Sequence, residues 1–449
     1  MKAYCAAWVL PVSSPPLQDA AVVVEGNTVT GLCRIDEVKK RFPNASVREL
    51  GEAAIIPGLI NAHSHLELTV MRGFLDEIEG DFFKWLRKLT LARQELTAGD
   101  LYVSCAWGAC EAVRAGVTCV ADSSDSARSS MQAILDIGLR GIVFQESFGP
   151  DPKLAVENFE KLQDKVAGLR ELQSDTVRIG VSPHAPYTVC SRQLELIARY
   201  AIEQELPLMM HAAESTLETE LLQSGSGLFA DKLRTRGIEW QPPHQSTIQY
   251  LADRGILETR PLLAHCINVN SIDLELIKDS RSKIAHCPRS NAKLGHGVAP
   301  LSQFLSHNIP VGLGSDSVAG NNSCDILMES RFAILTSRAF AASPSQPHLV
   351  ARDGLRMATT GGASALGLEH SIGALQVGFR ADFAVVALDG VHQQPSFDPV
   401  TTLMFASSAH DVILTVVAGR EVFAENEVKL LDEPGLHRRL REVAKKLGP

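Results

Sequence analysis

The sequence predicts an α/β protein: a (β/α)8 TIM barrel with a small β-sandwich domain built from both termini. Two observations support this. The middle of the chain alternates short apolar segments with helical patterns, which is typical of successive parallel βα units. Both ends read as strands separated by glycine turns. We expect residues 1–56 to begin the sandwich, 57–371 to form the barrel, and 372–449 to complete the sandwich and add a terminal helix.

The two ends of the chain carry the strand patterns of the smaller domain. Gly26 and Asn27 form a plausible tight turn between two of the N-terminal strands. The expected strands are 4–10, 20–25 and 28–32 near the N-terminus, and 382–388, 412–418 and 419–423 near the C-terminus.

Eight candidate strands in the middle of the chain account for the barrel. They are 54–61, 117–122, 141–145, 178–182, 207–211, 261–265, 282–286 and 310–314, with helical patterns such as 99–115, 191–205 and 325–336 between them. The active site of such a barrel lies at the carboxyl ends of its strands. A doubly wound sheet is the alternative, but no Gly-x-Gly-x-x-Gly follows the first strand.

Composition excludes several classes of protein. The 449 residues carry a net charge of −9, which disfavours a nucleic-acid backbone as partner. Nine cysteines without a Cys-x-x-Cys pair argue against a disulfide framework and a structural zinc site. We see neither a signal peptide nor an apolar run long enough for a membrane, so we expect a cytoplasmic protein.

A pair of histidines at the end of the first barrel strand indicates a metal site. His63 and His65 are spaced i, i+2, so on a strand both imidazoles point to one face and can reach one ion. His211 and Asp316 end the fifth and eighth strands. Any one histidine is more readily explained as a hydrogen-bonded core residue. Three nitrogens and one oxygen at strand ends, however, suit zinc or a similar divalent ion that keeps a place for water.

Other polar residues at strand ends are candidates for acid–base chemistry or substrate contact. Glu214 follows His211 by three residues and could accept a proton from the metal-bound water, although it could also be a helix N-terminal acid. His265 ends strand six and could orient that water. His184 ends strand four, where it suits a substrate contact or a structural role. His286 ends strand seven and stays a further candidate, ranked below His265.

These motifs resemble the amidohydrolase superfamily, specifically its cytosine deaminase and chlorohydrolase-like branch. The resemblance covers essentially the whole chain. The matching segments are 57–65, Arg72-Gly73, 211–214, His265-Cys266, 287–295, 314–316 and 373–382.

The resemblance implies a metal site with assisting residues. It assigns the metal to His63, His65, His211 and Asp316, places Glu214 and His265 beside the water, and gives Asp316 a part in proton transfer. Binuclear relatives carry a bridging Lys or Glu on strand three or four. No Lys ends either strand here, and Glu146 follows strand three. We expect one divalent metal, zinc before iron or manganese, with Glu146 left open as a contributor.

The resemblance also implies a reaction. The usual substrates of this branch are aminated heterocycles, whose amine is replaced by oxygen and leaves as ammonia. Two alternatives remain: another hydrolase on the same scaffold, acting on 8-oxoguanine, a pterin, a triazine chloride or a cyclic amide, or a non-catalytic homologue. The implied partners are the small heterocycle and water, and a homodimer would be common for the family.

Segments 65–69, 81–86 and 182–189 narrow the expected substrate. They resemble deaminases of 6-amino purine nucleosides, particularly aminodeoxyfutalosine deaminase and the adenosylhomocysteine and methylthioadenosine deaminases. A loop with Phe82, Phe83 and Trp85 could form an apolar wall for the purine, or it could be an amphipathic helix that buries its own aromatic rings. Glu67 could bind a ribose hydroxyl or be a solvated loop acid.

Overall fold

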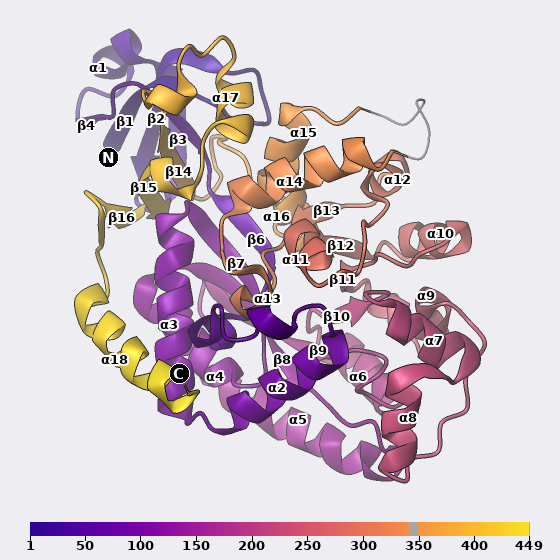
Figure 1. Cartoon of the computed structure of the whole chain (residues 1–449). Helices are drawn as coiled ribbons and strands as arrows, with labels where there is room; N and C mark the ends of the chain where they lie inside the picture. Colours follow the sequence, from indigo (N-terminus) through magenta and orange to yellow (C-terminus); the bar gives the residue numbers. More distant parts are fainter. Residues whose placement is uncertain (342–347, 449) are drawn as a thin grey trace.

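Two parallel four-stranded sheets form the centre of the computed structural model, which describes residues 1–341 and 348–448 (Figure 1). Their strand orders are β6-β7-β8-β9 and β10-β11-β12-β13. The bounds are Leu59–Ser64, Val117–Ser124, Arg140–Ser147, Val177–Pro183, Met209–Ala212, Leu262–His265, Lys283–His286 and Val311–Leu313. Each of the eight expected barrel strands has a counterpart here, and all but the first differ only near their ends.

The two sheets meet at both of their edges. An isolated parallel bridge joins Val181 to Leu208, between β9 and β10, and another joins Ser64 to Asp316, between β6 and the residues after β13. At the second junction the backbone N–H of Asp316 donates to the carbonyl of His63 at 2.9 Å. The strands thus follow one another around a closed circuit, and the predicted (β/α)8 barrel is confirmed.

The first predicted strand is wrong in one respect. The apolar run 54–61 is two strands: β5 (Ala53–Pro57) pairs with β14 and β1 of another sheet, whereas β6 begins the barrel. Pro57 has no N–H with which to continue a ladder. Gly58 follows, and a Cβ there would clash with the side chain of Thr118. The chain therefore changes sheets at Gly58, within a run that looks continuous in sequence.

A third sheet combines strands from both ends of the chain. Its order is β17-β16-β15-β14-β5-β1-β2-β3, with β4 beside β1. The other bounds are β1 Lys2–Val9, β2 Leu17–Glu25, β3 Thr28–Arg34, β4 Ser46–Glu49, β14 Phe383–Ala387, β15 Val412–Val417, β16 Arg420–Ala424 and β17 Glu427–Val428. One face forms a single apolar cluster, in which the rings of Tyr4 and Phe383 meet at 4.9 Å. The exact domain boundaries stay a prediction.

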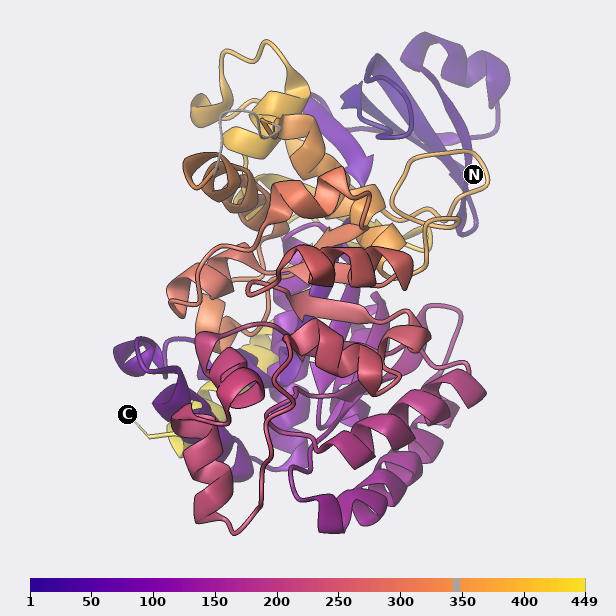
Figure 2. The ribbon, with the colours of Figure 1, turned by 90° about the vertical axis from the view of Figure 1, so that its right-hand side faces the viewer.

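Helices surround the barrel strands, and Figure 2 shows this helical body below the terminal sheet. The helices expected at 99–115, 191–205 and 325–336 are α3, α6 and α14. The longer helices are α2 Phe82–Gln94, α3 Ala98–Arg114, α4 Ala127–Ile137, α5 Ala155–Leu169, α6 Ser191–Glu203, α7 Thr216–Ser224, α8 Gly227–Thr235, α9 Thr247–Asp253, α10 Ser271–Asp279, α14 Ile326–Ala339, α17 Pro399–Phe405 and α18 Glu433–Lys446. The shorter ones are α1 Val38–Arg41, α11 Pro288–Lys293, α12 Leu301–Ser306, α13 Val318–Asn321, α15 Ala351–Arg356 and α16 Gly362–Ala365.

The expected terminal helix is α18, and it packs on the barrel helix α3 (Figure 1). The ammonium of Lys446 donates to Asp100 at 2.7 Å, and Arg114 pairs with Glu433 at 2.8 Å. The ring of His437 stacks on Trp107 at 5.1 Å. The end of the chain thus continues from the terminal sheet down the side of the barrel. Among the described residues, no helix combines the length and apolar character that crossing a membrane requires.

Candidate active site

Four predicted metal ligands meet at the carboxyl ends of the barrel strands. His63 lies on β6, His65 just beyond it, His211 on β10, and Asp316 three residues past β13. One ligand atom from each lies within 4.8 Å of the others. Oδ1 of Asp316 is 3.3 Å from Nε2 of His63 and 3.6 Å from Nε2 of His65, and the Nε2 atoms of His65 and His211 are 3.2 Å apart.

The chemistry of this donor set fits a divalent ion. Both ring nitrogens of His63 are buried without a hydrogen-bond partner among the described residues, which is costly unless another group binds them. Nδ1 of His211 is hydrogen-bonded to the carbonyl of His184 at 2.9 Å, so its Nε2 faces the cluster. Burial lowers the pKa of His63 to about 4, so its imidazole is neutral, the form that binds metals.

Asp316 is held in place from several sides. The side-chain oxygen of Asn61 accepts the backbone N–H of Ser315 at 3.0 Å, and its side-chain nitrogen donates to the hydroxyl of Ser315 at 2.8 Å. The hydroxyl of Ser290 donates to Oδ2 of Asp316. Burial opposes ionisation of Asp316, but the imidazole of His63 at 3.3 Å, with those of His265 and His65, outweighs burial and keeps the pKa of Asp316 well below its usual range. The carboxylate is therefore ionised and oriented for a cation.

Glu214 lies three residues beyond the candidate ligand His211, and three polar groups approach its carboxylate. Nε2 of His265 is 3.6 Å and Nε2 of His296 is 3.7 Å from Oε1, and the hydroxyl of Tyr187 is 3.5 Å from Oε2. The carboxylate of Glu218 accepts the backbone N–H of Glu214 at 3.3 Å and fixes the turn that carries it. Glu214 is thus a positioned carboxylate, not a solvated one.

His265 has a defined orientation. Its Nδ1 is hydrogen-bonded to Oδ1 of Asn291 at 2.8 Å, so its Nε2 faces Glu214. Burial alone would lower the pKa of His265, but the charges of Glu214 and Asp316 outweigh burial and raise it. The two carboxylates thus favour the protonated form of His265.

A second group of possible ligands consists of Glu146, His184 and His211. His211 belongs to both groups, and its Nδ1 is already used by the carbonyl of His184, so it can serve one ion only. Burial, followed by the charge of Glu67, raises the pKa of Glu146 well above its usual range, which weakens it as a ligand. These contacts agree with one metal rather than two. His286, at the end of β12, belongs to neither group among the described residues.

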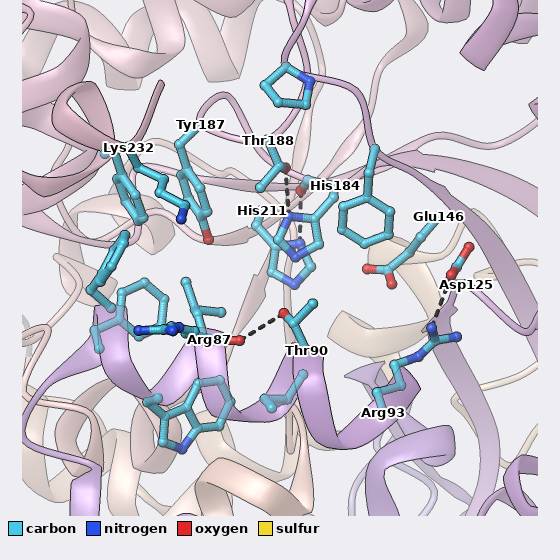
Figure 3. A pocket seen from close by; sticks show the side chains of 18 of the residues that line it. Arg87, Thr90, Arg93, Asp125, Glu146, His184, Tyr187, Thr188, His211 and Lys232 are labelled. Atoms are coloured by element: carbon cyan, nitrogen blue, oxygen red, sulfur yellow. Dashed lines mark hydrogen bonds and ion pairs between the residues drawn. The ribbon is translucent and has the colours of Figure 1, made fainter. Parts of the chain in front are cut away.

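The cluster opens into a cavity of about 820 Å³ (Figure 3). His65, His211, Glu214, His265 and Asp316 line it, as do His184, Glu67 and Trp85, which the sequence suggested as substrate contacts. The ring of His184 lies 4.6 Å from that of His211, and its Nδ1 is bonded to Thr188 at 2.9 Å. His184 therefore lies at the edge of the metal cluster and faces the cavity.

Both expectations for the aromatic segment hold in part. Residues 82–94 form helix α2, begun by Asp81, whose carboxylate accepts the N–H of Lys84 at 3.1 Å. The helix buries Phe82 and Trp85, and the same residues line the cavity. Opposite them, Tyr187 stacks on Phe229 of α8 at 4.2 Å. The wall is aromatic, as expected, but it is a helix instead of a loop.

Glu67 differs from its prediction. It is buried, and its carboxylate accepts hydrogen bonds from Arg93 at 2.8 and 3.1 Å, from the hydroxyl of Ser124 at 2.8 Å and from the N–H of Ser126 at 3.0 Å. A carboxylate has about four acceptor positions. These protein donors occupy them, so a free carboxylate for a ribose hydroxyl is not supported. Glu67 instead anchors Arg93 at the end of α2.

Sequence reasoning missed several residues of the site. Tyr187 was seen only as part of a motif, and Ser290, Arg93 and His296 were not singled out. Gly295 and Gly297, on either side of His296, were a usable signal, because paired glycines often mark a turn that presents a side chain. The ionic partners of Arg93 lie 26 and 32 residues away and had no local signal.

Comparison with known proteins agrees with this geometry. The profile of the amidohydrolase family matches residues 54–422. The chain belongs to this family. Two relatives named 5-methylthioadenosine/S-adenosylhomocysteine deaminase are similar to it. The protein of Syntrophomonas wolfei subsp. wolfei is 30% identical over 403 residues, 88% of this chain and 86% of its own. The protein of Pyrococcus horikoshii is 29% identical over 425 residues, 92% of each chain.

Solved structures give the same fold. A zinc-bound adenosine deaminase from Xanthomonas campestris has a TM-score of 0.86 and 25% identity, with 99% of this amidohydrolase and 98% of that chain covered. The aminofutalosine deaminase of Helicobacter pylori has a TM-score of 0.74 and 20% identity, with 94% of this chain and 100% of that chain covered. The zinc-bound atrazine chlorohydrolase of Arthrobacter aurescens has a TM-score of 0.85 and 23% identity, with 99% of this chain and 100% of that chain covered.

Proposed function

We propose that this amidohydrolase is a metal-dependent deaminase that removes the exocyclic amine of a purine nucleoside by hydrolysis. The observation that carries the proposal is the position of Glu214, which lines the same cavity as His65, His211 and Asp316 and lies 3.6 Å from His265. The relatives named as methylthioadenosine, adenosylhomocysteine and adenosine deaminases support it. Release of chloride or opening of a cyclic amide is not better supported, because the chlorohydrolase is 23% identical and shares the fold alone.

His63, His65, His211 and Asp316 would hold the metal. A divalent ion in that position, zinc above all, supplies the Lewis acidity that makes a water nucleophilic near neutral pH. The buried, neutral imidazoles and the ionised Asp316 match what such an ion needs, and a zinc-bound relative of the same fold supports the choice of metal.

The side chains around the cavity would move two protons. The oxygen of water bonds to the ring carbon that bears the amine. Glu214 accepts one proton of that water and delivers it to the adjacent ring nitrogen. The second proton passes, by way of Asp316 and His265, to the amine as the carbon–nitrogen bond breaks, and ammonia leaves. The water supplies the product's oxygen and both protons, so the reaction is balanced.

Replacement of Glu214 tests this assignment. Glu214→Gln keeps the shape of the side chain but removes its proton capacity, so we expect turnover to fall by about 10²- to 10⁴-fold with metal content unchanged. Ammonia release and metal analysis of the same preparation measure the two effects. A variant that retained wild-type turnover would remove Glu214 from proton transfer.

Charged residues at the cavity bear on the 5′ substituent of the nucleoside. Arg87 of α2, Lys232 of α8 and Arg236 line the cavity, and among the described residues none of them has an acidic partner. Of the acids that also line it, Glu67 and Asp125 are paired with Arg93, and Glu214 and Asp316 belong to the catalytic end of the cavity. Figure 3 shows Lys232 and Arg87 on the side of Tyr187, opposite Asp125.

This arrangement favours a substituent that is both aromatic and anionic. Phe229 and Tyr187 offer a flat apolar surface, and the unpaired cations beside it would attract a carboxylate. The 5′ substituent of aminodeoxyfutalosine carries an aryl carboxylate and is therefore both aromatic and anionic. The methylthio group of methylthioadenosine is apolar but carries no charge. The cytoplasmic location and the homodimer remain predictions.

Charge reversal tests the substituent. Lys232→Glu should raise the KM for the carboxylated nucleoside about tenfold and leave that for methylthioadenosine nearly unchanged, because one attractive charge becomes repulsive. Lys445→Glu, on an exposed position of α18 away from the cavity, is the matched control. Equal effects of Lys232→Glu on both substrates would contradict the anionic substituent.

A further inference from the structure

His296 lies on a turn that directs its side chain into the protein. It follows α11, and the glycines on either side of it have left-handed backbones, with φ of 71° at Gly295 and 106° at Gly297. The N–H of His296 donates to the carbonyl of Asn291 at 2.8 Å. The two glycines are exposed, yet the imidazole is only 5% exposed. The turn therefore buries a polar ring.

The buried ring faces Glu214. Nε2 of His296 is 3.7 Å from Oε1 of Glu214 and has no hydrogen-bond partner among the described residues. Buried polar atoms are rarely left without a partner, so such an atom calls for a reason. Nε2 of His265 approaches the same oxygen at 3.6 Å. Two imidazoles thus converge on one oxygen of Glu214 and leave the other on the side of Tyr187.

His296 lies behind Glu214, not in the cavity. Glu214 and His265 line the cavity and His296 does not. The ring of Phe82 packs against His296 edge-on at 4.4 Å, so the imidazole is enclosed between Glu214 and the start of α2. Asn291 contacts both residues: its side chain bonds to the imidazole of His265, and its backbone carbonyl accepts the backbone N–H of His296. His296 can therefore act on proton transfer through Glu214, whereas its contact with Phe82 concerns only the apolar wall.

We propose that His296 is a positioning residue for Glu214, an inference that rests on the proposed role of Glu214 in proton transfer. With substrate in the cavity, the Nε2 hydrogen of His296 bonds to Oε1 and turns Oε2 toward the water and the ring nitrogen. Hydrogen bonds to catalytic groups are often long before substrate binds and shorten in the complex, which accounts for the 3.7 Å separation. His296 contacts neither the substrate nor the metal ligands in this account.

Two amide side chains of different reach test the proposal. His296→Gln can place a donor where Nε2 lies, whereas the shorter His296→Asn cannot. We expect His296→Asn to lower kcat about 100-fold, because a misoriented Glu214 transfers the proton poorly, and to leave KM within about threefold. His296→Gln should recover kcat to within about tenfold of wild type. His307→Asn, at a half-buried histidine outside the cavity, is the control.

A double variant separates positioning from packing. If His296 acts through Glu214, adding His296→Asn to Glu214→Gln should cause no further loss of kcat, since effects of residues acting as a unit are not additive. The proposal is overturned if the two losses multiply, if His296→Asn keeps wild-type kcat, or if Gln and Asn lower kcat equally.

A measurement without turnover distinguishes this inference from the proposed function. In zinc-loaded protein labelled with ¹⁵N-histidine, the Nε2 signal of His296 should shift on Glu214→Gln, because the carboxylate lies 3.7 Å from that nitrogen even before substrate binds, and the signal of His307 should not shift. Absence of the shift in His296 contradicts the inference even if the enzyme is a deaminase. The shift without ammonia release from wild type supports the contact and contradicts the proposed function.

Discussion

The ends of the barrel strands adopt backbone conformations that few side chains favour. Ala213, His265, Cys266 and Asp316 have φ of 53°, 72°, 47° and 56°, in the left-handed region where residues other than glycine are uncommon. Each follows or ends a strand that carries a polar group of the site. Such strain persists where surrounding contacts enforce it, and it is typical of functional sites. Here the carboxylate of Glu218 enforces it by accepting the N–H of Ala213 at 2.8 Å.

Asp122 gives a prediction about stability. It is fully buried on β7 and accepts hydrogen bonds from the N–H of Leu66 at 2.7 Å and from the hydroxyls of Ser64 and Ser130. Burial raises its pKa to about 7, above the usual 3.8. The folded state therefore binds the proton more tightly than the unfolded state, and stability falls as the pH rises from about 4 to about 7.

Asp122→Asn removes this dependence, because an amide does not ionise: its oxygen can accept from Leu66 and Ser64, and its nitrogen can donate to the hydroxyl of Ser130. Between pH 5 and pH 8 the unfolding free energy of wild type should fall relative to that of the variant by on the order of a few kcal/mol. Denaturant unfolding of both proteins across this range measures the difference. A constant difference would mean that Asp122 ionises normally in the folded protein.

At this scale the sequence predicted which four candidate ligands lie together, and it missed the residues that support them. His63, His65, His211 and Asp316 meet because parallel strands end at one side of a barrel, a rule that needs only the strand pattern. His296 and Arg93 could not be found this way. Their roles depend on how a turn and a helix pack against the barrel, and Glu67 was misjudged because its partners lie in other elements.

Helix α2 forms one wall of the cavity, and ion pairs of Arg93 hold its C-terminal end in place. Arg93 pairs with Glu67 and Asp125, and the carboxylate of Glu67 is almost wholly buried. The sequence left the choice between a loop and a helix open for this segment. Both the helical pattern and the aromatic wall were present in it, and only packing shows that one face of the helix serves both purposes.

The ion pairs of Arg93 with Glu67 and Asp125 predict linked effects on protein stability and substrate binding. Arg93→Met leaves the charge of Glu67 buried without its partner, so we expect a loss of about 3–5 kcal/mol in unfolding free energy and a higher KM. Metal content should be unchanged, because Arg93 touches none of the ligands. Adding Glu67→Gln removes the buried charge and should restore part of the stability. If Arg93→Met alone were as stable as wild type, these ion pairs would not hold α2 in place.

At the scale of the whole molecule, the barrel and the terminal sheet are joined where the chain crosses between them. Arg140 on β8 pairs with Asp382 beside β14 at 2.7 Å, and the carbonyl of Asp382 accepts the N–H of Gly58 at 3.0 Å. Alternating apolar segments predicted the barrel and the joining of both termini. They did not predict the change of sheet at Gly58 or the packing of α18 on α3, since both depend on contacts between distant segments.

The central claim is that this arrangement hydrolyses the amine of a purine nucleoside, and ammonia release tests it most directly. Zinc-loaded protein should be assayed with adenosine, 5′-deoxyadenosine, methylthioadenosine, adenosylhomocysteine and aminodeoxyfutalosine. We predict one ammonia per deaminated nucleoside, loss of activity when a chelator removes the metal, and recovery when zinc is restored. Protein that holds its metal yet releases no ammonia from any of these nucleosides would contradict the account.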